Sequence, residues 1–61
     1  MNTIEILITE NKALQTSITK LLKQVNKVMK TNLNGAKLIF ARIEELDAKR
    51  LDNNRVIISL Q

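Results

Sequence analysis

The sequence predicts an all-α protein, a two-helix antiparallel hairpin that self-associates into a helical bundle. Apolar residues recur every three or four positions along most of the 61 residues, and such residues share one face of a helix. The chain contains no Pro and a single Gly, so almost nothing interrupts a helix. That Gly lies near the middle of the chain, directly after Asn34, and Asn-Gly is a common turn dipeptide.

The first apolar series predicts a helix over about residues 3–31. Its members are Ile4, Leu7, Asn11, Leu14, Ile18, Leu21, Val25, Val28 and Asn32. Only the two Asn are polar, so the series forms one apolar stripe. Asn2 and Glu5 have the spacing of a capping box, which would begin this helix.

A turn is predicted near residues 31–35, with residues 32–35 outside both helices. Gly commonly follows the last residue of a helix, and Asn and Gly both tolerate positive φ. We therefore expect the first helix to end there and the chain to reverse.

The second apolar series predicts a helix over about residues 36–53 that can extend to residue 60. Its members are Ala36, Ile39, Ile43, Leu46, Arg50, Asn53, Ile57 and Leu60. The extension is open because residues 56–58 are β-branched, as are the alternating Ile4, Ile6 and Ile8 near the start. A strand–helix–helix–strand arrangement is therefore an alternative.

A continuous parallel coiled coil is the main alternative to the hairpin. The two series join through two steps of four, which is a stutter at residues 28–36. The width of the apolar face favours the bundle, because Ile8, Leu22, Met29 and Phe40 lie beside the stripes and a two-stranded coiled coil needs only a narrow one.

Self-association is expected because a chain of this size buries only about 60% of its unfolded surface. With no Cys and no His, neither disulfides nor the usual zinc ligands can stabilise it. The partner is then the chain itself, as a dimer of hairpins or a trimer. The predicted self-association core is Leu7, Leu14, Ile18, Leu21, Val25, Val28, Ile39, Ile43, Leu46 and Ile57. Asn11 and Asn53 are polar positions within it that we expect to set the register.

The residue types present argue against catalysis. His and Cys, the usual general base and thiol nucleophile, are missing, and one Gly cannot build a phosphate-binding loop. We expect no enzyme activity, no cofactor, no metal and no small-molecule substrate. The acidic residues Glu45 and Asp47 have the spacing of helix ion pairs with Lys49 and Arg50.

Charge distribution provides the one indication of a partner. The net charge is +4, and the span from Asn11 to Ile43 contains seven basic residues and no acidic one. Within it, one row along a helix face is formed by Lys20, Lys23, Lys27 and Lys30, and Lys37 lies near the turn. Such a surface suits a nucleic-acid backbone or an acidic protein.

These observations predict a non-enzymatic, homo-oligomeric helical interaction module, a small regulator or adaptor that binds another macromolecule. The alternatives are a nucleic-acid-binding regulator that uses the Lys row and a structural coiled-coil or trimerisation segment. No apolar run approaches the roughly 20 residues that span a bilayer, so we expect no membrane partner and a cytoplasmic location. The abundance of Ile, Asn and Lys is typical of AT-rich genomes such as those of phages and plasmids.

Overall fold

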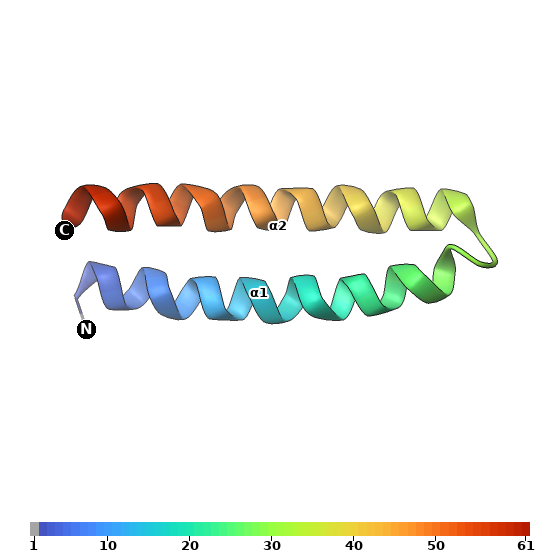
Figure 1. The fold of residues 1–61 in the computed structure, drawn as a ribbon, viewed down its shortest axis with the longest axis horizontal. Coiled ribbons are helices and arrows are strands. Elements are labelled where there is room, and N and C mark those ends of the chain that lie inside the picture. Colours follow the sequence, from blue (N-terminus) through green and yellow to red (C-terminus); the bar gives the residue numbers. More distant parts are fainter. Residues whose placement is uncertain (1) are drawn as a thin grey trace.

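A computed structural model describes residues 2–61 as a helical hairpin. Helix α1 comprises Thr3–Val28 and helix α2 comprises Leu33–Leu60, and the two lie side by side with opposite directions (Figure 1). The hairpin measures 45 × 15 × 11 Å, and both chain ends lie at the same end of it. This confirms the predicted all-α hairpin and excludes a continuous helix within one chain.

Helix α1 begins where the sequence predicts. The Glu5 backbone N–H donates a hydrogen bond of 2.8 Å to Asn2 Oδ1, so Asn2 is the N-cap. This bond satisfies one of the backbone donors that the first turn of a helix leaves without a partner.

The position of the turn was predicted wrongly by about three residues. Helix α1 ends at Val28 instead of near residue 31, and α2 begins at Leu33 instead of near residue 36. The reason is Asn32, which has an extended backbone and accepts a hydrogen bond of 3.0 Å from the Gly35 N–H at its Oδ1. Asn32 is therefore the N-cap of α2, and the chain reverses over residues 29–32.

Gly35 consequently has a different role from the one predicted. It lies in the first turn of α2, and no Gly in the described residues has positive φ. A Cβ atom at this position would lie 3.2 Å from Val28 Cγ1 and 3.2 Å from Asn32 Nδ2. Gly35 thus permits the close approach of the two helices beside the turn, where Ala36 is fully buried.

Both ends of the hairpin are helical. Helix α2 continues to Leu60, and residues 2–61 contain no strand, so the strand–helix–helix–strand alternative is wrong. The β-branched residues 56–58 stay helical because Ile57 lies on the stripe that contacts α1, and tertiary packing outweighs a modest local preference.

The contact between the two helices is a single narrow seam. The ten residues of the predicted core all lie on it, with Ile18 and Val25 buried and the others half-buried. Within residues 2–61, only three hydrophobic side chains are buried, namely Ile18, Val25 and Ala36.

Neither α1 nor α2 contains a stretch with the hydropathy of a membrane-spanning helix.

We predict that Asn32→Ala lowers the free energy of unfolding by about 1 kcal/mol, because it removes the N-cap of α2. The measurement is urea unfolding followed by circular dichroism at one fixed protein concentration. Asn34→Ala is the control, because Asn34 is exposed in the first turn of α2 and is not the cap. This substitution should leave the free energy of unfolding unchanged or slightly higher. Equal effects of the two substitutions would contradict the assignment of the cap.

Candidate interaction surfaces

A cluster of polar side chains interrupts the seam in the open half of the hairpin. Asn53 Nδ2 donates hydrogen bonds of 3.0 Å to Asn11 Oδ1 and 2.9 Å to Glu10 Oε1. Asn11 Nδ2 in turn donates a hydrogen bond of 2.8 Å to Asn54 Oδ1. The two seam Asn residues expected from the sequence are therefore in direct contact, and Asn53 is 8% exposed.

Sequence reasoning missed two members of this cluster, Glu10 and Asn54. Both lie directly beside a seam residue, Asn11 and Asn53 respectively, and both are only partly exposed. Their roles depend on which side of the partner helix each one faces, and the register of the hairpin determines this. The available indication of the cluster in the sequence was that Asn11 and the Asn53-Asn54 pair lie at similar distances along the chain from the turn.

Ion pairs near the cluster differ in part from the predicted ones. Asp47 Oδ1 lies 2.8 Å from Arg50 Nη2, which confirms that pair. The predicted pair of Glu45 with Lys49 is wrong, because Lys49 Nζ lies 3.7 Å from Glu10 Oε1 on the other helix. Glu45 instead lies 3.0 Å from Arg42. The proximity of α1 gives Lys49 a partner that spacing within one helix cannot reveal.

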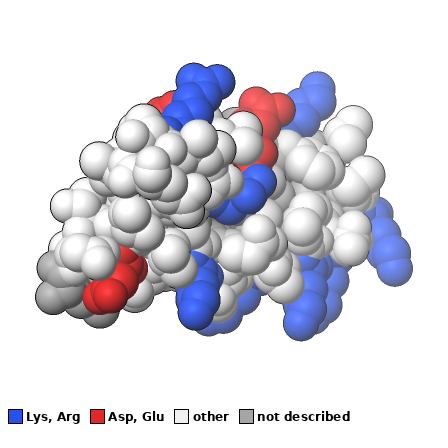
Figure 2. Space-filling view, turned by 60° about the vertical axis from the view of Figure 1, so that its left-hand side comes forward, with Lys and Arg blue, Asp and Glu red and all other residues white. Residues whose placement is uncertain are grey.

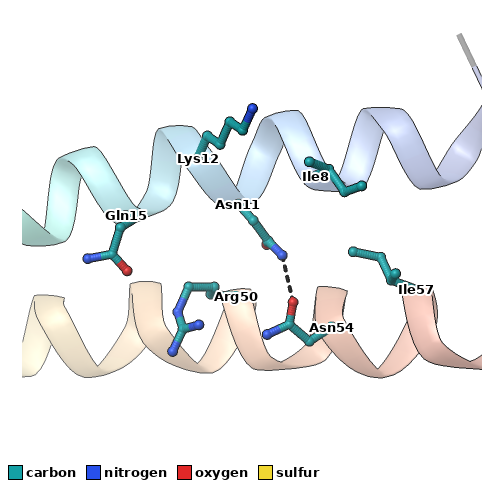
Figure 3. A pocket seen from close by; sticks show the side chains of 7 residues that line it. All are labelled: Ile8, Asn11, Lys12, Gln15, Arg50, Asn54 and Ile57. Atoms are coloured by element: carbon teal, nitrogen blue, oxygen red, sulfur yellow. Dashed lines mark hydrogen bonds between the residues drawn. The ribbon is translucent and has the colours of Figure 1, made fainter.

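A groove of about 430 Å³ lies beside the cluster, along one side of the seam (Figure 3). Ile8 and Ile57 flank the Asn11–Asn54 hydrogen bond toward the chain ends, and Gln15 and Arg50 flank it toward the turn. The groove is lined by Ile8, Asn11, Lys12, Gln15, Arg50, Asn54 and Ile57.

The hairpin has one apolar side, which we call the apolar flank and define as Ile8, Leu22, Met29 and Phe40. Each of these residues directly follows a seam residue, so all four lie on the side of the seam that also holds the groove. Their exposed fractions lie between 41% and 48%.

The opposite side of the seam carries more charged residues. The residues that directly precede seam positions there include Glu10, Ser17, Arg42 and Lys49, and the large apolar residues among them are Ile6, Leu38 and Val56. The ion pair between Lys49 and Glu10 crosses between the helices on this side. The two flanks of the hairpin therefore differ in their content of charged and apolar residues.

The predicted Lys row lies on the outer face of α1. Lys20, Lys23, Lys27 and Lys30 are all exposed, as is Lys37 at the start of α2. Figure 2 shows basic side chains gathered along the lower edge of the molecule, where α1 lies. In residues 2–61, the ion pairs involve Arg42, Lys49, Arg50 and Arg55, and none involves these five lysines.

Comparison of the chain with protein-family models, curated proteins and solved structures finds no significant match. The surfaces described above are therefore the basis for a functional proposal.

We predict that Asn53→Ala lowers the free energy of unfolding by about 1–3 kcal/mol, because Asn11 and Glu10 lose a donor at a buried position. Asn26→Ala, at an exposed position of α1, is the control and should have little effect.

The double variant Asn11→Leu with Asn53→Leu should recover the lost stability, since apolar side chains then replace both partners. Urea unfolding of the four proteins measures these differences. A double variant that is less stable than Asn53→Ala would contradict the assigned role of the pair.

Proposed function

We propose that this chain is a non-enzymatic, homo-oligomeric helical interaction module, a small regulator or adaptor that binds another macromolecule. The observation that carries the proposal is the balance between buried and exposed apolar side chains. Against three buried hydrophobic residues, the described residues expose eleven large ones: Ile6, Ile8, Leu22, Met29, Leu33, Leu38, Phe40, Leu51, Val56, Ile58 and Leu60.

The shape of the hairpin supports self-association. Its radius of gyration is 14.2 Å, whereas a globular chain of this length has about 10.5 Å. Its accessible surface is 4716 Å², whereas a compact monomer of 7.0 kDa exposes about 4,000 Å². A single hairpin therefore leaves a large apolar area in water, and burial of that area against another copy would stabilise the fold.

A rigid helical rod with separate faces suits an adaptor. One side of the hairpin can hold the oligomer together while the outer face of α1, with its exposed lysines, remains free for a second partner. Net positive charge on that face favours a partner that carries negative charge.

We predict that the protein sediments at equilibrium as a species of at least about 14 kDa, which is twice the 7.0 kDa of one chain. The thermal midpoint should rise with protein concentration, because association stabilises only the folded state. A species of 7.0 kDa with a concentration-independent midpoint would contradict the proposal.

Nucleic-acid binding is the second candidate function, and the Lys row is the observation that favours it. Four lysines at steps of three and four share one exposed face and have no acidic partner in residues 2–61. Backbone phosphates can contact such a row without any reading of base sequence.

For this candidate we predict that RNA or DNA duplexes bind with an affinity that falls steeply with salt. Four phosphate contacts correspond to a slope of log K against log salt of about −3 to −4. Replacement of Lys20, Lys23, Lys27 and Lys30 with Gln should abolish the gel shift without loss of helicity.

Replacement of the same four lysines with Arg is the first control and should preserve binding, since the charge remains. Replacement of Arg42, Lys49, Arg50 and Arg55 with Gln is the second control, because it removes the same charge from α2, where these four residues form ion pairs. If the two Gln variants lose binding equally, net charge rather than the row is responsible.

A further inference from the structure

We propose that the apolar flank binds the apolar flank of a second copy of this chain, with the two hairpins reversed end for end. In this dimer the turn of one hairpin lies beside the open end of the other. The inference rests on the self-association proposed above, and it specifies the surface and the orientation.

The first argument is the difference between the two sides of the seam. Ile8, Leu22, Met29 and Phe40 widen the apolar stripe on one side, where the charged residue Asp47 is already paired with Arg50. Glu10, Arg42 and Lys49, together with the apolar Val56, border the stripe on the other side. Burial of this other side would remove charged groups from water, which is costly without new partners. The apolar flank is therefore the side that a second copy can cover at least cost.

The second argument is area. The hairpin exposes 4716 Å², about 700 Å² more than a compact monomer of its mass. A standard protein–protein interface buries about 800 Å² on each partner. One copy docked on one flank therefore accounts for the excess surface, and no further partner is needed to explain it.

The third argument is shape, and it selects the orientation. The groove of about 430 Å³ lies in the open half of the apolar flank, between Ile8 and Gln15, whereas Leu22 and Met29 lie on the same flank in the turn half. Reversal of one copy about the middle of α1 brings its Leu22 to the level of Ile8 in the groove of the other copy, because these two residues lie at similar distances from that middle. A two-fold axis makes both halves of such an interface equivalent. If the turns of both copies lay at the same end of the dimer, the groove of one copy would face the groove of the other and leave a void.

The fourth argument is charge. Lys27, Lys30 and Lys37 surround the turn, and no acidic residue occurs between Asn11 and Ile43. A same-end dimer would bring two such clusters within one or two helix diameters of each other. The reversed dimer separates them by nearly the 45 Å length of the hairpin, several times the Debye length of about 8 Å.

The test of the surface compares two double variants that each remove two exposed apolar side chains. Leu22→Gln with Met29→Gln changes the apolar flank, whereas Ile6→Gln with Leu38→Gln changes residues on the other side of the hairpin that are at least as exposed. Sedimentation equilibrium should give a dimer dissociation constant about a hundredfold higher for the first variant, and within about twofold of the original for the second.

The orientation is tested in a protein whose apolar flank is not substituted. Because the chain has no Cys, Asn34→Cys provides a single site for a spin label in the exposed first turn of α2. Double electron–electron resonance spectroscopy should give a distance of about 45 Å between the two spin labels of one dimer. Dilution with unlabelled protein should remove this distance, which shows that it joins two copies.

The possible outcomes separate the two proposals. A protein that remains monomeric at all concentrations overturns the proposed self-association and this inference with it. A dimer weakened by Ile6→Gln with Leu38→Gln, and not by Leu22→Gln with Met29→Gln, overturns the surface alone. A label distance of about 10–20 Å, one or two helix diameters, overturns the reversed orientation while the dimer stands.

Discussion

The constraint on which the structure depends is that two helices in contact share only one seam. A seam of this kind covers one stripe on each helix, and among the apolar residues of the described range 2–61 it buries only Ile18, Val25 and Ala36. Hydrophobic burial is the main favourable term in folding, so an apolar surface wider than the seam is available for a further contact. The elongated shape and the excess of accessible surface are both consequences of this geometry.

Polar residues within the seam have a different effect from the apolar ones. Asn11 and Asn53 would weaken the contact if they were isolated, but the hydrogen bonds among Glu10, Asn11, Asn53 and Asn54 satisfy their amides. These bonds form at one alignment of the two helices, whereas aliphatic side chains tolerate several. We propose that the cluster contributes specificity of register at a position where apolar residues would contribute more stability.

The side chains around the seam differ from face to face, so different faces of the hairpin suit different kinds of contact. One flank is mostly apolar and hollowed, and the other carries more charged residues and is bridged by an ion pair. Within residues 2–61, the lysines on the outer face of α1 form no ion pair. A face that assembles copies and a face that contacts an anionic partner can thus act on the same short rod without competition. This arrangement is the physical basis of the proposed adaptor function.

The sequence by itself determined that the chain is helical and which residues form its apolar stripes, because a period of 3.6 residues is a local property that any helix displays. It favoured a hairpin over a continuous coiled coil, and the tertiary structure made that choice. It also located the exposed lysines of α1. Only the tertiary structure decided that Asn32 rather than Gly35 defines the turn, that Glu10 and Asn54 join the polar cluster, and that Lys49 pairs with Glu10. The Asn32 cap is a local contact with Gly35, and the backbone conformation of the folded turn decides whether the cap or a glycine ends the helix. The contacts of Glu10, Lys49 and Asn54 depend on the distance and register between helices that are far apart in the chain, and periodicity within one helix contains no information about either.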